Sequence, residues 1–316
     1  MTAVVPTPAK PARRRNEKGE AVQGRRARKS ATHFDPNPAR AGWFARIVLT
    51  VLCLLWLTPI LGTLITSFRP LRDAENTGWW TALVGENAFQ GFTFDNYKEA
   101  WNGADMAGAF VNSLAIALPA TVIPILIAAF AAYAFTFMRF PGRDALFLVI
   151  VSLLVIPNFV AFVPLLRIYG DLGINGTFPA VWLAHIGFGM SLAVYILRSY
   201  MVTLPGTVIE SAKIDGASHF QTFWRLVLPM SMPALASFAI LQFLWVWNDL
   251  LVALVFIGPG ENEPVTVSLT SLRGQLGQGW NLTTAGGFIT MVLPIFVFLT
   301  MQRFFVRGLT AGAVKG

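Results

Sequence analysis

The sequence predicts an all-α polytopic membrane protein with six transmembrane helices. Three observations predict this fold class: 55% of the 316 residues are hydrophobic, only 13% are charged, and the apolar residues gather in long runs. Soluble domains carry about 25% charged residues. A run of about 20 apolar residues is long enough to cross the hydrocarbon core as a helix. A soluble enzyme is therefore disfavoured, and a disordered chain is excluded.

Six apolar runs account for the predicted spans, and they cover residues 44–66, 110–137, 146–166, 179–197, 233–257 and 284–305. The first run is too long and starts too far from Met1 for a signal peptide, and no A-x-A-like cleavage site follows it. We therefore expect a retained signal-anchor helix. Prolines within spans two and three can kink these helices and shape a cavity, although proline is common in membrane helices: Pro119, Pro124, Pro157 and Pro164.

Basic residues are concentrated on one predicted side of the membrane. Residues 1–46 hold eleven Lys and Arg against three acids, so 1–43 is predicted to be a basic, disordered cytoplasmic tail preceding a transmembrane domain over 44–316. With the N-terminus in the cytoplasm, 19 of the 24 basic residues lie inside and nine of the 16 acids lie outside. The positive-inside rule then places both termini in the cytoplasm. The net charge of +8 thus reflects topology rather than nucleic-acid binding, and the tail can add affinity for anionic membrane lipid.

Signatures of catalysis and of metal binding are absent from the sequence. It contains no G-x4-G-K-[ST], no H-E-x-x-H and no G-x-S-x-G. The three histidines, His33, His185 and His219, are scattered, and His185 and His219 are best explained as packing or interface residues. Cys53, the single cysteine, lies in an apolar run. We expect no catalytic residue, no metal and no cofactor in this chain.

The segment between spans four and five, residues 198–232, has the pattern of two short helices. Thr207 to Glu210 and Ser218 to Gln221 both have capping-box spacing, and Gly216 lies between them, where a helix ends most easily on a residue that tolerates positive φ. Pro229 is expected to end the second helix. One helix offers a small face (Ser211, Ala212, Ala217) and the other an apolar face (Phe220, Phe223, Trp224, Val227). Two amphipathic helices resting on the membrane surface would fit the pattern equally well.

The same segment resembles the E-A-A-x3-G-x9-I-x-L-P signature of the permeases of binding-protein-dependent ABC importers. The spacing holds throughout, with Ser211 in place of Ala and Leu226 in place of Ile. The resemblance implies that this loop is the coupling helix, which docks into a cleft of the cytoplasmic ATP-binding subunit. It assigns the docking to Glu210, Ser211, Ala212, Asp215, Gly216, Ala217, Leu228 and Pro229.

Further motifs resemble the MalG-like subunit type of the maltose and α-glucoside importers. They are FTFDNY at 92–97, Asn112-Ser113, RFPGR at 139–143 and QRFFVRGLTAGAVKG at 302–316, and TGWW at 77–80 resembles α-glucoside permeases. In the maltose importer the C-terminal tail reaches between the two ATPase subunits. The resemblance implies such contacts for the tail at 306–316, through Gly308, Leu309, Thr310, Gly312, Lys315 and Gly316.

Polar groups within the spans are candidates for the solute path, because they are costly in the membrane. Asn158 lies in span three, and Gln242, Asn248 and Asp249 lie in span five, where Asp249 is the only acid placed inside a span. Trp245 offers an aromatic face on which a sugar ring can stack. We take Asn158, Trp245, Asn248 and Asp249 as path candidates; alternatively, Asn248 and Asp249 hold helices together or lie near the outer interface.

The predicted function is that of a permease subunit of an ATP-driven sugar importer in a bacterial inner membrane. The resemblance implies a second permease subunit, two ATP-binding subunits that hold ATP and magnesium, and an extracytoplasmic sugar-binding protein as partners. An importer for another solute and an ion-coupled secondary transporter are the alternatives. The latter predicts inverted repeats and several ionisable groups within the spans, and the sequence shows one Asp and no visible repeat. A receptor or scaffold with a lipid-binding tail would leave the loop spacing unexplained.

Overall fold

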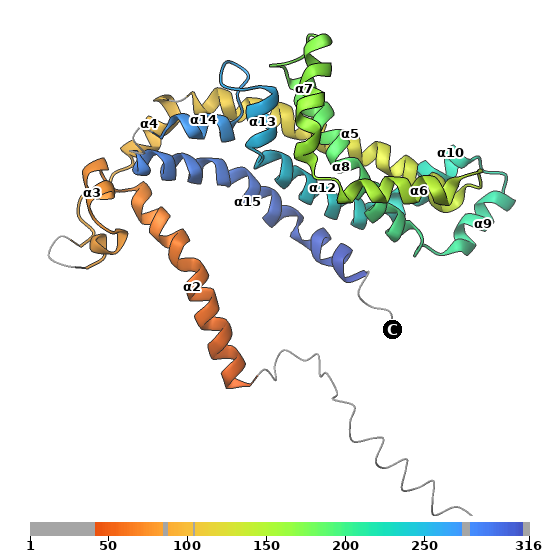
Figure 1. The fold of residues 1–316 in the computed structure, drawn as a ribbon. Helices are drawn as coiled ribbons and strands as arrows, with labels where there is room; N and C mark the ends of the chain where they lie inside the picture. Colours follow the sequence, from red (N-terminus) through yellow and green to blue (C-terminus); the bar gives the residue numbers. More distant parts are fainter. Residues whose placement is uncertain (1–41, 85–87, 104, 274–278, 312–316) are drawn as a thin grey trace, which may run out of the picture. The chain divides into compact units, whose positions relative to one another are not determined.

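A computed structural model describes residues 42–84, 88–103, 105–273 and 279–311 of the chain, with side chains as far as 302. These residues form helices joined by turns, and none of them lies in a β-strand. The chain divides into two units, residues 1–57 and 58–316. The described part of the first unit is the beginning of helix α2 (Trp43–Ser67), and the remaining elements belong to the second unit (Figure 1).

Long helices and short connecting helices alternate in the second unit. In chain order they are α3 (Leu71–Asn76), η2 (Trp79–Ala82), α4 (Asp95–Gly103), α5 (Met106–Phe137), α6 (Arg143–Ser152), η3 (Leu153–Val155), η4 (Asn158–Ala161), α7 (Phe162–Asp171), α8 (Phe178–Met201), α9 (Gly206–Ile214), α10 (His219–Thr222), the π-helical turn η5 (Phe223–Val227), α11 (Leu228–Met230), α12 (Met232–Trp247), α13 (Leu251–Phe256), α14 (Val265–Ser271) and α15 (Trp280–Ala311).

Four of the six predicted spans are continuous helices. Those helices, α2, α5, α8 and α15, are long and apolar enough to cross a membrane, and two bent helix pairs raise the number of candidate spans to as many as six among the described residues. The all-helical membrane fold is therefore confirmed. The helix of the last span also runs further than predicted, because α15 stays helical to Ala311.

The third predicted span is broken rather than continuous. Its two halves, 143–155 and 158–171, meet at an angle of 96°. The break falls at Ile156, which is extended at φ −77° and ψ 122° because Pro157 follows it. Steric contact with the proline ring disfavours the helical conformation for the preceding residue, so a single proline turns the chain here.

The fifth predicted span is interrupted as well, after α12. The Asn248 side chain donates to the Leu244 carbonyl at 2.7 Å, and the Asp249 carboxylate accepts from the Val252 amide at 2.7 Å. Short polar side chains that bond nearby backbone compete with the helix in this way. Asp249 thus caps the start of α13 and lies between two helices. Asp249 therefore lies at a break within the fifth predicted span rather than inside a continuous helix.

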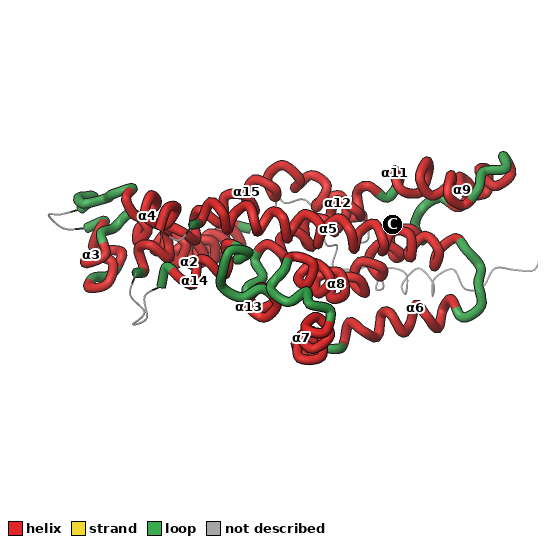
Figure 2. Tube along the Cα trace, turned by 90° about the horizontal axis from the view of Figure 1, so that it is seen from above, coloured by secondary structure: helices red, strands yellow, loops and turns green. Residues whose placement is uncertain are grey.

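The centre of the second unit is a seam of small residues. Helix α5 packs along α8 and α12 (Figure 2). Eight alanines of α5 and α8 are at most 1% exposed: Ala117, Ala120, Ala128, Ala129, Ala132, Ala180, Ala184 and Ala193. Small side chains let membrane helices approach closely. Because lipid is as apolar as the helix surfaces, van der Waals contact rather than the hydrophobic effect holds the helices together.

At the end of the unit that carries α3, α4 and α14, amide side chains tie the connecting segments to the helices. Asn96 donates to the carbonyls of Ser67 and Arg69, both at 2.8 Å, and accepts from the Asn281 amide at 2.8 Å. Asn112 donates to the Glu261 carbonyl at 2.8 Å. The asparagines of the FTFDNY and Asn112-Ser113 motifs therefore have structural roles.

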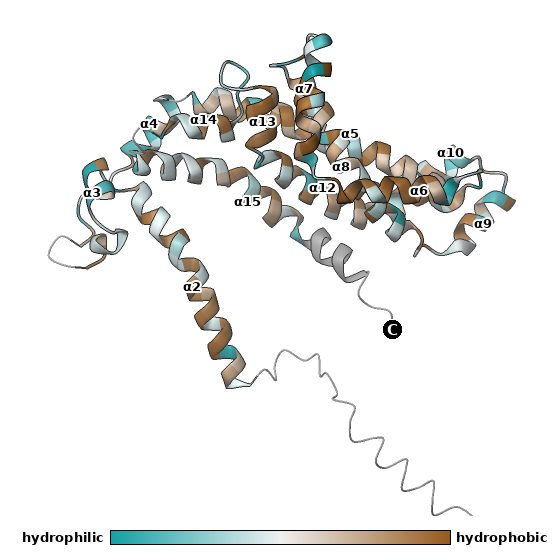
Figure 3. Ribbon diagram, viewed as in Figure 1, coloured by the Kyte–Doolittle hydropathy of each residue, from teal (hydrophilic) through white to brown (hydrophobic). Residues whose placement is uncertain are grey.

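The outer surface of the long helices is apolar. Along α2 and α15 the exposed side chains include Trp56, Leu55, Val292 and Phe296, which are between 62% and 79% exposed. Brown, apolar residues predominate on α6 and α13 and recur along α2 in the hydropathy view (Figure 3). Monomeric soluble proteins rarely expose apolar patches of this extent, so these faces are suited to lipid or to a partner subunit.

Candidate functional site

The connection between α8 and α12, residues 202–231, is referred to here as the α8–α12 loop. Its first helix, α9, ends in a Schellman motif: the Ala217 amide donates to the Ala212 carbonyl at 3.0 Å, and the Gly216 amide donates to the Lys213 carbonyl at 3.1 Å. Gly216 has a φ of +78°. The left-handed conformation costs an L-residue with a side chain about 1–2 kcal/mol. The turn therefore requires the glycine of the E-S-A-x3-G spacing, because glycine has no Cβ.

The second helix of the loop starts with a capping box. Ser218 accepts from the Gln221 amide, and Gln221 accepts in return from the Ser218 amide at 2.9 Å. The sequence predicted this box correctly. The corresponding prediction for Thr207 and Glu210 is wrong, because α9 already begins at Gly206 after Pro205 and has no side-chain cap. Because Pro205 is the N-cap residue, Thr207 lies inside the first turn of α9.

Pro229 does not end the second helix, contrary to the prediction. The helix continues through η5 and α11 to Met230, and then bends by 72° at Ser231 into α12. Proline has no amide hydrogen, so the Arg225 carbonyl loses its α-helical partner. The π-helical turn just before it, where the Leu228 amide donates to the Phe223 carbonyl, takes up this irregularity.

Buried and exposed side chains divide the loop into an anchor and an outer surface. Ile209, Phe223 and Val227 are at most 3% exposed and belong to the same apolar cluster as Tyr133 and Phe135 of α5. The most exposed apolar side chains are Ile214 at 86% and Phe220 at 67%, and Trp224 is 39% exposed. The predicted apolar face is thus split, with half of it anchoring the loop. Ile214 was not identified from the sequence as an exposed apolar residue. Its position between the charged residues Lys213 and Asp215, just before the turn at Gly216, is a pattern that could have indicated this exposure.

Aromatic contacts join the loop to α5. Phe223 stacks on Phe130 with ring centroids 4.4 Å apart, and Tyr133 packs edge-on against Phe223 at 5.4 Å. The Tyr133 hydroxyl is hydrogen-bonded to His219 Nδ1 at 3.0 Å. The loop is therefore packed directly against the long helix α5.

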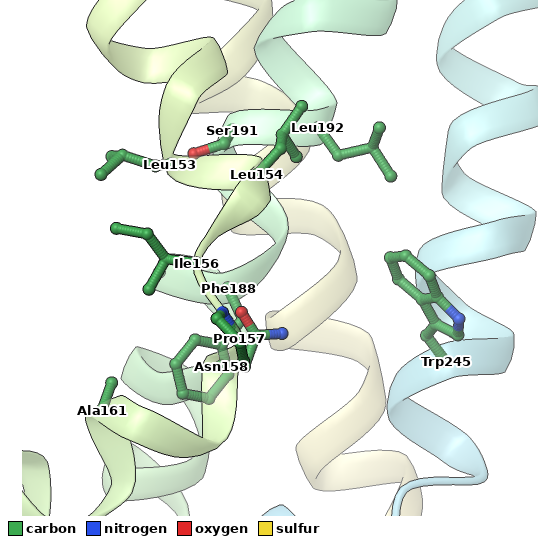
Figure 4. Close-up of a pocket in the computed structure, with 11 residues that line it drawn as sticks. Leu153, Leu154, Ile156, Pro157, Asn158, Ala161, Phe188, Ser191, Leu192 and Trp245 are labelled. Carbon is green, nitrogen blue, oxygen red and sulfur yellow. The ribbon is translucent and has the colours of Figure 1, made fainter.

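A second candidate site lies where the two broken spans meet. Asn158, Trp245 and Asp249 all line a cavity of about 180 Å³, referred to here as the polar cavity. An adjoining cavity of about 380 Å³ shares Asn158, Phe188 and Trp245 with it. In Figure 4, which shows the adjoining cavity, Trp245 of α12 stands across from Pro157, Asn158 and Phe188.

Three of the four predicted path residues are thus brought together, and one is not. Asn248 is exposed, bonds its own helix and lines neither of these two cavities. Sequence reasoning left out His185 and Gln242, which line the polar cavity and are 7% and 2% exposed. Gln242 could have been found from the sequence, since it is an amide inside an apolar run. The position of His185 at the cavity follows only from the packing of α8.

The predicted contacts of the C-terminal tail fall at the end of the described chain. Gly308, Leu309 and Thr310 lie in the last turns of α15. Gly312, Lys315 and Gly316 lie outside the described residues, as does the basic segment 1–41. Among the described residues, no group of three or more metal-binding side chains occurs together.

Comparison with known proteins identifies relatives over most of the chain. Residues 123–311 match the family described as "Binding-protein-dependent transport system inner membrane component". The osmoprotective compounds uptake permease protein GgtD of Synechocystis sp. is 51% identical over 85% of this chain and 91% of its own length. The α-glucoside transport system permease protein AglG of Rhizobium meliloti is 53% identical over 71% of this chain and 61% of its own length.

Among solved structures, a bacterial ABC transporter involved in the import of the acidic polysaccharide alginate has a similar fold. The TM-score is 0.68 at 20% identity, and the match covers 82% of this chain and 94% of that chain.

Proposed function

The chain belongs to the family of binding-protein-dependent transport system inner membrane components, and from this premise we propose that it is one of two permease subunits of an ATP-driven sugar importer. In this family the inner membrane component is a transport subunit rather than an enzyme, and ATP hydrolysis is supplied by a separate subunit. The cargo proposal draws on two relatives whose names mention osmoprotective compounds and α-glucosides. A neutral α-glucoside is accordingly the proposed cargo class.

The observation that carries the coupling mechanism is the geometry of the α8–α12 loop. Its Schellman turn at Gly216 and capping box at Ser218 hold two helices in a fixed relation, and buried Phe223 anchors them. Ile214 and Phe220 project from this rigid base. Exposed apolar side chains rimmed by charge are typical of interaction sites. We assign the cleft of the ATP-binding subunit as their partner, with Glu210, Ser211, Ala212, Asp215, Ala217, Leu228 and Pro229 shaping the docking segment.

Movement of the loop then drives the rest of the subunit. When the ATP-binding subunits close, they displace the α8–α12 loop, and the Phe130–Phe223 stack and the Tyr133–His219 hydrogen bond carry the displacement into α5. Energy transfer is mechanical in this scheme. ATP and magnesium are bound by the partner subunits, and the C-terminal segment 306–316 adds a second contact with them.

The proposed topology places both termini and the α8–α12 loop in the cytoplasm. Its support is the distribution of charge, with 19 of the 24 basic residues on that side. The opposite end, which carries α3, α4 and α14, then faces the sugar-binding protein. The basic tail lies beside the cytoplasmic leaflet, where anionic lipid attracts Lys and Arg.

The test of the docking role is the substitution Gly216→Trp. A tryptophan at φ +78° strains the turn and fills the docking surface, so we expect normal insertion into the membrane, loss of sugar uptake and loss of the ATP-binding subunit on co-purification. Gly173→Trp is the matched control, because Gly173 also has a positive φ of +68° and open space around it but lies between α7 and α8. Normal co-purification of the ATP-binding subunit with Gly216→Trp contradicts the docking role.

The cargo is tested separately with the sugar-binding protein. Its affinity across maltose, trehalose, sucrose and glucuronic acid is expected to favour a neutral α-glucoside. Preference for an anionic sugar, or for none of these, contradicts the proposed cargo and leaves the docking role standing.

A further inference from the structure

Two interruptions of the membrane helices lie next to the polar cavity. The break at Ile156–Pro157 precedes Asn158, and the break after Trp247 contains Asp249, and both of these residues line the cavity. Non-helical backbone at membrane depth is tolerated only where it is buried in protein or lines a hydrated cavity. Interrupted helices in transporters place backbone and side-chain polar groups at a solute. The position of the two breaks therefore indicates a binding site rather than a packing fault.

A buried polar atom at this cavity lacks a partner. The Gln242 side chain is 2% exposed, and its Nε2 donates to the Ala120 carbonyl at 3.2 Å. Its Oε1 has no hydrogen-bond partner within the described part of the chain. A buried acceptor left unpaired is costly, and each such group calls for an explanation. Gly189 of α8 makes room for this amide, since a Cβ there would lie 2.8 Å from Oε1.

The remaining walls of the cavity are suited to a sugar ring. Trp245 is 60% exposed and faces the adjoining cavity, which at about 380 Å³ lies within the size range of small-molecule sites. Phe159, Phe162 and Phe188 add aromatic surface. Asp249 uses one carboxylate oxygen to cap α13, which leaves the other for a hydroxyl donor.

We propose that the polar cavity, together with the adjoining one, binds one ring of a neutral sugar during its passage through this subunit. Trp245 stacks on the ring, and Gln242 Oε1 and Asp249 accept hydrogen bonds from its hydroxyls. The Asp249 carboxylate repels anionic sugars, in contrast to the acidic polysaccharide imported by the structurally similar transporter. This inference rests on the proposed sugar-import function, and it adds that substrate contacts lie on this subunit.

The first test measures sugar moved per ATP hydrolysed, using the complete transporter in proteoliposomes with its binding protein and radiolabelled maltose, trehalose or sucrose. For Gln242→Leu and Trp245→Leu we expect this ratio to fall about three- to tenfold, the size of one lost hydrogen bond or contact. The ATPase rate stimulated by the loaded binding protein stays normal, because docking is intact. Trp245→Phe, which keeps an aromatic face, restores most of the ratio.

The matched control for these variants is Trp56→Leu on α2, where the indole is 79% exposed and outside the cavities. Trp245 is itself largely exposed, so its variant is expected to fold even if Gln242→Leu does not assemble. An unchanged ratio in Trp245→Leu, or an equal fall in Trp56→Leu, overturns the site. If the wild-type complex moves none of the neutral sugars, the proposed import function itself is overturned. This outcome is distinguishable from failure of the site, which leaves wild-type transport intact.

The second test identifies the occupant directly. Photoreactive p-benzoylphenylalanine in place of Trp245 is expected to cross-link to the labelled sugar in the assembled transporter. Excess glucuronic acid should compete poorly in this chain and better after Asp249→Asn, which keeps the cap acceptor but removes the charge. Cross-links to the second permease alone, with none to sugar, overturn the proposal, because a partner side chain then fills the cavity.

Discussion

In the α8–α12 loop the bonds that set the two helix ends join residues close in sequence, whereas in the polar cavity the lining residues come from segments far apart in the chain. The Schellman bond at Gly216 spans five residues and the capping box at Ser218 spans three. The cavity brings Asn158, His185, Gln242 and Asp249 together from η4, α8, α12 and the break after α12. The loop can therefore keep its shape while it moves, and the cavity must change whenever the helices do.

This difference is what a mechanically driven importer requires. A docking segment needs a fixed shape, since its partner recognises the projecting side chains. A solute site in an alternating-access transporter needs the opposite property, because the solute enters from one side and leaves on the other. Helix α5 connects the two regions: Tyr133 and Phe130 contact the loop, and Ala120 bonds Gln242 beside the cavity.

The largest expected effect comes from removing the anchor of the loop. Phe223 is 2% exposed and stacked on Phe130, so Phe223→Ala leaves a hole between the loop and α5. Truncation of a buried phenylalanine costs about 3–5 kcal/mol. We expect the free energy of unfolding, measured by denaturant titration in detergent, to fall by that amount.

Phe220→Ala is the control for this variant, because Phe220 lies in the same loop but is 67% exposed. It should leave the free energy of unfolding nearly unchanged and weaken only the binding of the ATP-binding subunit. Equal destabilisation by the two variants would remove the distinction between anchor and outer surface.

A smaller effect is expected at the capping box. Ser218→Ala removes the acceptor for the Gln221 amide, and loss of an N-cap costs about 0.5–2 kcal/mol. Thr207→Ala is the matched control, since Thr207 has the same spacing to an acid or amide but caps nothing. Hydrogen exchange of the amides in α10 should rise in the first variant alone. Faster exchange in both would mean that the loop is not held by local bonds.

The smallest expected effect concerns the link between the two regions. Tyr133→Phe removes the hydrogen bond to His219 and keeps the aromatic packing, so stability should change by only about 0.5–1.5 kcal/mol. Transport should respond more strongly: ATPase activity continues, and less sugar is moved per ATP. The same ratio as in the wild type would show that this bond does not carry the movement of the loop to α5.

Local sequence signals were sufficient for most of the fold. Long apolar runs located the four continuous spans, and Gly216 and the Ser218 capping box were placed correctly. The two wrong predictions for the loop also have local causes. Helix α9 begins directly after Pro205, so Thr207 does not cap it, and the π-helical turn before Pro229 allows the second helix to continue past the proline. Pro157 was recognised as a possible kink, but the 96° break was not expected, because the extent of a bend depends on what packs against the two halves.

The sequence by itself determined the membrane class, the order of the spans, the turn at Gly216 and the start of α10, since hydrophobic length and turn chemistry act over a few residues. Only the tertiary structure decided which polar residues face one another. Asn158, Trp245 and Asp249 meet at one cavity while Asn248 does not, and His185 and Gln242 join them through the packing of α8 and α12. The sequence pattern of one helix does not specify which residues of another helix will face it, so the cavity can be identified only once the helices are packed together.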